Sequence, residues 1–269
     1  MSIREALKAD FGIEVRVNRG SGQRDDPFVI EPSTAAEAVR TQLDLLRGLS
    51  RGRRELWRLL TVEPAGDDTP AMQRVRVETI AFTPEEFITE VRAFYFDVSQ
   101  VDGLPDAGAP LIVWTDPRTT FAAVSQIGWL HFDNAIDNSR DDTALNASLF
   151  YSAIGAKATI YVYSASDPTA KGLPPNQRRD RELHSVCSQV HAENGEADSP
   201  WPAQVAGPFV LKHFLIGDDL SVAGIAILGE HFLKLRMTCR DEPKMREVMR
   251  DTVEELACLV HKKGPGLNN

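Results

Sequence analysis

The N-terminal half of the chain contains one strongly periodic segment, at residues 34 to 47. Thr34 and Glu37 have the spacing of a capping box, in which each side chain accepts a hydrogen bond from the other residue's backbone N–H. Apolar residues follow at helical intervals, at Val39, Leu43, Leu46 and Leu49. We therefore predict an amphipathic helix over about 34 to 47 that ends at Gly48, since glycine readily adopts the left-handed conformation found just past helix ends.

Four further segments indicate helices. We predict a short helix over residues 2 to 10 and a longer one over about 178 to 193. Another is predicted to begin at Thr83, because Pro84 would occupy the first helical position and Glu86 would complete a capping box. The last covers about 242 to 262, with an apolar stripe formed by Met245, Val248, Met249, Leu256 and Leu259.

Alternating or β-branched runs predict strands elsewhere. Two of them are ELWRLLTVE and QRVRVETIAF, and in the second apolar and charged residues alternate as in a sheet with one solvated face. APLIVWTD is predicted to be a short buried strand, and IGWLHFD and KATIYVYSAS are further strands. Three C-terminal runs follow, PFVLKHFLI, LSVAGIAIL and HFLKLRMTC, and the last two flank Gly229 and Glu230 as in a hairpin.

The order of these elements predicts an α+β fold. Strict strand–helix alternation is absent, so we expect mainly antiparallel sheet with single helices packed on one face. A C-terminal hairpin followed by the long amphipathic helix completes the prediction. We predict a single domain over residues 1–269. Similar strand-to-helix junctions in VRVETIAFTPEEFITEVRAFY and LKLRMTCRDEPKMREVMRDTV leave open two related lobes, at about 12–100 and 143–262.

Composition and charge exclude several classes of protein. A hydrophobic content of 42% with 26% charged residues is ordinary for a globular chain, which excludes wholesale disorder. The net charge of −9 argues against general binding to nucleic acid or to anionic membranes. No apolar run is long enough to span a bilayer, and MSIREALKADFG lacks the apolar region of a signal peptide. An odd number of scattered cysteines favours a reduced, cytoplasmic location, and the excess of arginine over lysine suggests a bacterial source.

The stretch GLSRG at 48 to 52 matches the nucleophile elbow G-x-S-x-G in letters only. That motif needs a strand before the serine and a helix after it, whereas here the predicted order is reversed. The surrounding arginines form the densest positive cluster and could bind a phosphate or nucleotide: Arg47, Arg51, Arg53 and Arg54. The competing interpretation is that arginines near a helix C-terminus offset the helix dipole.

Two groups of residues are candidates for chemistry that uses histidine. His184, Cys187 and His191 lie at i, i+3 and i+7 of a predicted helix, a spacing that could hold a metal or activate the thiol. Alternatively, Cys187 belongs to an ordinary apolar stripe. If IGWLHFD is a strand, alternation places His131 and Asp133 on one face, where they could act as an acid/base pair or as metal ligands.

The alternative for His131 is a buried histidine with a hydrogen-bonded partner. The following DNAIDNSRDD does not match a calcium loop, because alanine and asparagine occupy positions that need an acid and a glycine. We expect this stretch to be a polar loop.

These patterns favour a non-catalytic binding or assembly protein that binds a protein partner or a second copy of itself. Trp129 and Trp201, in or beside predicted loops, are candidate interface anchors, although they fit core edges equally well. The alternative is a metal-assisted or histidine-based hydrolase that gathers the two histidine groups, with His213 or His231 added. A phosphate or nucleotide binder using the arginine cluster is a third possibility, and no motif assigns a cofactor.

Overall fold

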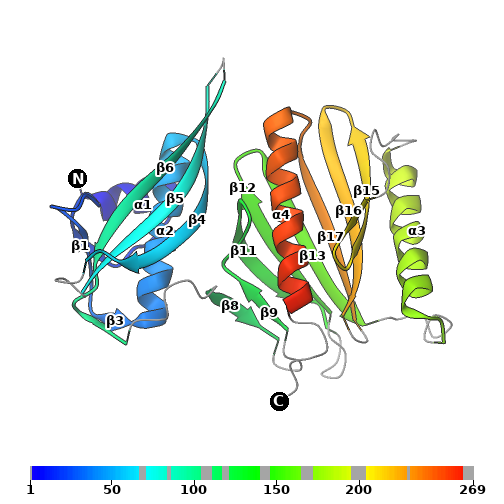
Figure 1. Cartoon of the computed structure of the whole chain (residues 1–269), viewed down its shortest axis with the longest axis horizontal. Coiled ribbons are helices and arrows are strands. Elements are labelled where there is room, and N and C mark those ends of the chain that lie inside the picture. Colours follow the sequence, from blue (N-terminus) through cyan, green and yellow to red (C-terminus); the bar gives the residue numbers. More distant parts are fainter. Residues whose placement is uncertain are drawn as a thin grey trace. The chain divides into compact units, whose positions relative to one another are not determined.

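The computed structural model describes residues 2–66, 71–83, 86–103, 111–116, 121–139, 146–164, 172–194, 204–228 and 231–262. For residues 191–194, 204–206, 228, 261 and 262 it describes the backbone alone. Contacts between Cα atoms divide the chain into two compact units, Met1–Leu111 and Ile112–Asn269. Each unit combines helices with mainly antiparallel sheet, so the α+β class expected from the sequence is confirmed (Figure 1).

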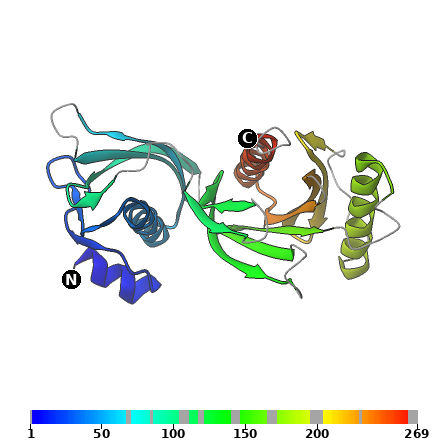
Figure 2. The same ribbon diagram turned by 90° about the horizontal axis from the view of Figure 1, so that it is seen from below.

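Unit 1 has a five-stranded sheet in the order β1-β2-β6-β5-β4, within which β2 and β6 are parallel and the other pairs antiparallel. Its elements are α1 (Ile3–Phe11), β1 (Val17–Arg19), β2 (Phe28–Ile30), β3 (Ser33–Thr34), α2 (Ala35–Arg53), β4 (Glu55–Pro64), β5 (Met72–Phe82), β6 (Phe87–Asp97) and β7 (Val101–Asp102). Helix α2 lies on the sheet and α1 packs beside α2 (Figure 2). The core between them includes Leu45, Val75 and Phe96.

The predicted capping box at the start of α2 is present, but the predicted end of that helix is wrong. Thr34 and Glu37 exchange the expected side-chain-to-backbone hydrogen bonds. The helix continues through Gly48 to Arg53 and ends where Arg54 adopts a left-handed conformation, with φ of 57°. A Cβ atom on Gly48 would lie 2.4 Å from Leu7 of α1, so this glycine allows two helices to approach closely and does not end one.

The helix predicted to start at Thr83 is also wrong, because β6 occupies that segment. The Thr83 hydroxyl accepts a hydrogen bond from the Glu86 N–H, as an N-cap would, while the Thr83 N–H donates to the Glu86 carbonyl. These bonds close the connection between β5 and β6, in which Phe82 pairs with Phe87. Both segments of the noted sequence similarity begin in a strand, β5 in the first and β17 (His231–Arg240) in the second. The first then continues into strand β6, whereas the second continues into helix α4 (Pro243–Lys262).

Unit 2 has an eight-stranded sheet in the order β10-β11-β12-β13-β17-β16-β15-β14, and every neighbouring pair is antiparallel. Its elements are β8 (Ile112–Thr115), β9 (Ala122–Val124), β10 (Gln126–Ile127), β11 (Leu130–Asp137), β12 (Asn146–Ala153), β13 (Ala156–Ser164), α3 (Pro175–Asn194), β14 (Gln204–Ala206), β15 (Phe209–Ile216), β16 (Asp219–Leu228), β17 (His231–Arg240) and α4 (Pro243–Lys262). The predicted C-terminal strands and the long final helix are therefore confirmed.

Helices α3 and α4 lie on opposite faces of this sheet (Figure 2). Phe232 of β17 packs with Leu183 of α3, whereas the next residue, Leu233, faces the same space as Leu256 of α4. Successive side chains of a strand point to opposite faces, which accounts for this division. Helix α3 packs mainly on β15 and β16, and on the same face it also contacts Tyr163 at the end of β13.

Three local predictions for unit 2 need correction. Strand β8 was expected to be buried, but Ile112 is 57% exposed. IGWLHFD is not one strand, because a turn at Gly128 and Trp129 separates β10 from β11. The stretch expected to be a polar loop continues β11 as far as Asp137, and residues 140–145 lie outside the described part of the chain. No helix in the described residues is both long enough and apolar enough to cross a membrane.

Candidate functional site

His131 and Asp133 are not related by simple strand alternation. His131 is buried, at 8% exposure, and pairs with Ser152 of β12. Asp133 is exposed and is the extra residue of a β-bulge, because Phe132 pairs with Tyr151 while Asn134 already pairs with Phe150. A bulge interrupts the two-residue period, so the predicted common face of His131 and Asp133 is not formed by alternation.

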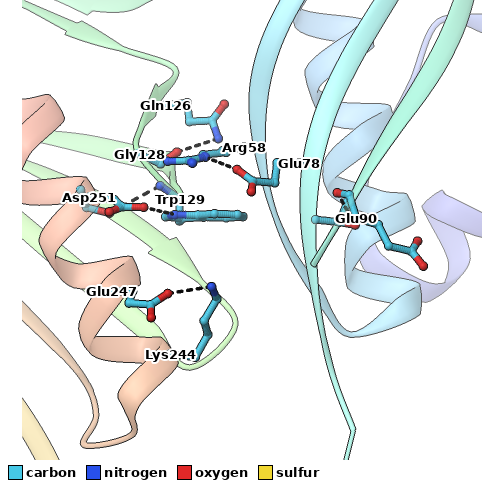
Figure 3. A network of polar contacts seen from close by, with 11 residues as sticks. Arg58, Glu78, Glu90, Gln126, Gly128, Trp129, Lys244, Glu247 and Asp251 are labelled. Carbon is cyan, nitrogen blue, oxygen red and sulfur yellow. Dashed lines mark hydrogen bonds and ion pairs between the residues drawn. The ribbon is translucent and has the colours of Figure 1, made fainter. Parts of the chain in front are cut away.

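Trp129 belongs to the interior of unit 2. Its side chain is 3% exposed, and its indole N–H donates to the Asp251 carboxylate of α4 at 3.3 Å (Figure 3). Its backbone N–H lies 3.5 Å from the Thr252 hydroxyl. These contacts attach the β10–β11 turn to α4, which gives Trp129 a structural role inside the unit. Trp201 lies outside the described residues.

The structure describes the side chains of two of the three predicted metal-binding residues on α3. Leu183, Val186 and Val190 face the sheet and form the buried stripe of the helix. Cys187 is half-buried beside this stripe and His184 is exposed, while only the backbone of His191 is described. Burial raises the pKa of the Cys187 thiol, with nearby Lys212 acting in the opposite direction. Neither observation favours an activated thiolate.

The two predicted histidine groups lie over different strands. His131 is on β11, whereas α3 packs on β15 and β16. Strand β16 is four strands from β11 in the sheet, which corresponds to about 19 Å at the usual spacing. Within the described residues, no group of three His, Cys, Asp or Glu side chains is placed to hold a metal ion.

The arginines predicted to bind phosphate surround the C-terminal end of α2. Arg51, Arg53 and Arg54 are exposed, and Arg47 is half-buried one turn earlier. Helix C-termini carry partial negative charge, so cations placed there stabilise the helix without any ligand. The placement fits both interpretations, and phosphate binding stays a prediction. Ser50 of the GLSRG stretch is buried within the helix, at 8% exposure.

A serine–histidine contact that the sequence did not indicate lies at the ends of β13 and β17. Ser164 Oγ is 3.2 Å from His231 Nδ1, and the two residues are direct cross-strand neighbours. Nucleophilic catalysis also needs a group that orients the histidine. The described contacts of His231 include no carboxylate.

The face of the sheet that α3 covers in part carries a positive surface on its remaining strands. Strand pairing places Tyr161 opposite Lys234, Thr159 opposite Arg236, and Lys157 opposite Thr238. We call the surface formed by Lys157, Tyr161, Lys234 and Arg236 the basic face. Lys157 and Arg236 are exposed, and Lys234 Nζ lies 4.9 Å from the centre of the Tyr161 ring.

Apolar and aromatic side chains adjoin the basic face. Ile136 of β11 is 47% exposed, and its register with Ser148 and Tyr161 puts it on the same side of the sheet. Phe150 of β12 is half-buried opposite Thr159. The alternation within each strand is readable from the sequence, but the pairing of β13 with β17 is not, because the paired positions are 67 (Ser164 and His231) to 83 (Ala156 and Cys239) residues apart.

The opposite side of the sheet contains a small apolar pocket of about 40 Å³ beneath α4. Its walls come from β9, the central strands and the last turns of α4, and they include Val124, Leu149, Ile160, Leu233 and Leu256. Among the described lining residues, Tyr151 carries the one polar side-chain group, a hydroxyl that donates to the Val124 carbonyl at 2.9 Å.

The buried Cys239 of β17 lies where the sheet meets the start of α4. Its Sγ is 3.7 Å from the Met245 carbonyl. Burial, together with the carboxylates of Asp241 and Asp219, raises the pKa of this thiol to about 12. At neutral pH the group is therefore a protonated thiol.

No protein-family model and no curated protein matches this sequence. The geometry of the described residues is therefore the basis for a functional proposal.

Proposed function

We propose that the chain is a non-catalytic binding protein that binds a protein partner, or a second copy of itself. The proposed contact is the basic face and the neighbouring side chains of β11 and β12, on the same face of the unit 2 sheet as α3. The observation that supports this most directly is the exposure of Ile136 beside Tyr161, Phe150 and three cations, on a face where α3 covers β15, β16 and the ends of β13 and β17 at Tyr163 and Phe232. Partly exposed aromatic and arginine side chains are the residue types that contribute most to protein interfaces.

The competing explanation is an ordinary solvated sheet face, since antiparallel sheets often have one side in water. Such faces are usually covered by short polar and charged residues. Here the face contains the exposed Ile136 and the half-buried Phe150 and Tyr161, which gain more from a partner's contact than from water. A histidine-based or metal-assisted hydrolase has less support, because the candidate histidines lie over strands that are far apart in the sheet.

Site-specific photocrosslinking tests this proposal. A photoreactive amino acid placed at position 136 in the full chain should give an adduct of defined mass in cells of the source organism. The same amino acid at position 254, on the exposed side of α4, should give none. The adduct should disappear when Tyr161→Ala is added. A chain that sediments as a monomer and gives no adduct beyond the 254 control would contradict the proposal.

We also propose a cytoplasmic location for this activity. The three described cysteines are free, and one of them, Cys258, is exposed. Free exposed thiols persist best in a reducing compartment. Cell fractionation with an antibody to the chain tests this, and recovery from the medium or an oxidising compartment would contradict it.

A further inference from the structure

One edge of strand β6 in unit 1 is open along most of its length. In the sheet β6 lies between β5 and β2, but β2 pairs only with Phe96 and Asp97 at the end of β6. One further backbone bond, from the Tyr95 N–H to the Gly22 carbonyl, extends this contact. Within the described part of the chain, no strand pairs with residues 87–94 on that side. Over these residues β6 is therefore an edge strand.

The backbone groups that point out of this edge belong to every second residue. The Tyr95 N–H bonds to the side away from β5, and the pairing of β5 with β6 is regular. In a regular antiparallel pair, residues that bond to the partner strand alternate with residues that point outward. The N–H and C=O groups of Thr89, Val91 and Ala93 therefore face outward. All three residues are exposed, Val91 to 54%.

This edge lacks the bulges and prolines that often protect an exposed strand from pairing with another chain. The opposite edge of the same sheet, β4, has a bulge between Leu59 and Thr61 and ends at Pro64. Residues 87–94 contain no proline, and their pairing with β5 has no bulge. A further strand can therefore be added to β6 without a change in its backbone.

The sequence of the open edge, ITEVRAF at residues 88–94, is self-complementary about its central Val91. If two copies of this segment pair antiparallel with Val91 opposite Val91, each Glu90 lies directly opposite the Arg92 of the second copy. Glu90 and Arg92 already form an ion pair within one chain, at 2.8 Å, and the Glu90 side chain remains 51% exposed. The acids and bases of both copies would then alternate around the axis of the pair.

Backbone geometry and charge favour the same register. Val91 would form a hydrogen-bonded pair with its copy, and Thr89 would form another with Ala93, because these residues direct their N–H and C=O groups out of the edge. An axis at residue 90 would keep such hydrogen bonds but place Glu90 opposite Glu90. Like charges directly opposite one another are destabilising. Charge therefore selects the register centred on Val91.

We propose that two copies of the chain pair through this edge, antiparallel about a two-fold axis at Val91, so that their unit 1 sheets become continuous. Ile88, which is 38% exposed, would lie opposite the half-buried Phe94 of the second copy. A two-fold contact of this kind closes on itself, so it prevents the open-ended pairing that exposed edges otherwise favour. This contact is separate from the one proposed for the basic face, which belongs to unit 2.

Disulfide trapping in the full chain tests the register. The background is Cys258→Ser, because Cys258 is the exposed cysteine among the three. Val91→Cys should give a covalent dimer on mild oxidation, since Cα atoms of a hydrogen-bonded pair are about 5.5 Å apart, within disulfide range. Glu90→Cys would place the thiols on a diagonal of about 7–8 Å and should give little dimer. Glu254→Cys, on the exposed side of α4, measures trapping by random collision.

Sedimentation at low to high micromolar concentrations tests whether backbone pairing holds the dimer. Val91→Pro removes an N–H that does not bond to β5, so β6 itself should still form. The substitution should raise the dimer dissociation constant about tenfold or more, because both hydrogen bonds at the axis are lost. Val91→Thr keeps the N–H and a side chain of the same shape, and should dimerise like the parent chain. Circular dichroism checks the fold of both variants.

Several results would overturn the inference. These are a parent chain that stays monomeric throughout the concentration range, a dimer that Val91→Pro leaves intact, and trapping at position 90 or 254 that equals trapping at position 91. A dimer that is lost with Tyr161→Ala and kept with Val91→Pro would lie at the basic face instead. A photoreactive residue at position 91 that crosslinks only to another protein would also overturn it. The adduct at position 136 bears on the basic face alone, so the two proposals can fail separately.

Discussion

Gly128 lies directly against Thr252: a Cβ atom added to the glycine would be 2.7 Å from both the Cα and the Oγ1 of the threonine. The φ angle of Gly128 is +55°, in the left-handed region that side chains disfavour. The turn between β10 and β11 therefore reaches α4 only because this position has no side chain. The Thr252 hydroxyl that contacts it donates in turn to the Val248 carbonyl.

We predict that Gly128→Ala lowers the free energy of unfolding by about 2–4 kcal/mol, from backbone strain and steric overlap together. Gly217 is the matched control. Its φ is +62° and a Cβ atom added there would meet nothing within 4 Å, so Gly217→Ala should cost only about 1 kcal/mol. Urea unfolding of both variants measures the difference. Equal costs would mean that the close approach to α4 is unimportant.

The buried amide pair of Gln42 and Gln73 gives a prediction for unit 1. Gln42 Nε2 donates to Gln73 Oε1 at 2.8 Å, and both residues are buried. Gln42→Met should cost about 1–3 kcal/mol, because the Gln73 amide loses its partner in the interior. Adding Gln73→Met should recover most of that loss. If the double variant is instead as unstable as the sum of the single variants, the hydrogen bond is not what couples them.

An ion pair with a buried carboxylate and an exposed ion pair in unit 1 can be compared for their effects on stability. The Arg92 guanidinium donates to the Glu55 carboxylate at 2.7 Å, and the Glu55 side chain is 7% exposed. Arg92→Met should cost about 2 kcal/mol, between the values for surface and buried pairs, since it leaves a carboxylate in a poorly hydrated site. Lys8→Met, which breaks an exposed pair with Glu14, should leave stability almost unchanged, because water screens the two charges.

Thermal or urea unfolding at neutral pH compares these two variants. An equally small effect at Arg92 would show that water reaches Glu55.

His213 should make unit 2 sensitive to mild acid. Its side chain is buried on β15, at 4% exposure, and burial lowers its pKa below the ordinary value of 6.5. The folded state then binds fewer protons than the unfolded state, so the contribution to stability is present above pH 6.5 and is lost as pH falls below it. Urea midpoints measured between neutral and mildly acidic pH should fall less steeply for His213→Gln. An unchanged slope would assign the acid sensitivity to other groups.

Local signals in the sequence were reliable where the interactions that they describe are local. The capping box of Thr34 and Glu37 involves residues three apart, and it forms as predicted. Thr83 makes a similar bond to Glu86, yet the chain continues as β6 because pairing with β5 overrides the local preference. Gly48 was misinterpreted because its role depends on Leu7, a residue of another helix.

The candidate site shows the same limit. Alternation along β13 and β17 separates buried from exposed positions, so Lys157 and Arg236 are recognisable as surface residues. Their proximity depends on register between strands that are distant in sequence. The bulge at Asp133 is likewise a property of the pairing with β12, and no single-strand pattern reveals it.

The position of Cys239 provides a built-in reporter of motion. An alkylating reagent attacks the thiolate, so this protonated and enclosed sulfur can react only in molecules where the junction of β17 and α4 has opened. Cys258, exposed on the same helix, reacts in the closed molecule and calibrates the reagent. Mass spectrometry of the two alkylated peptides over time would therefore measure how often the junction of β17 and α4 opens locally in the native protein.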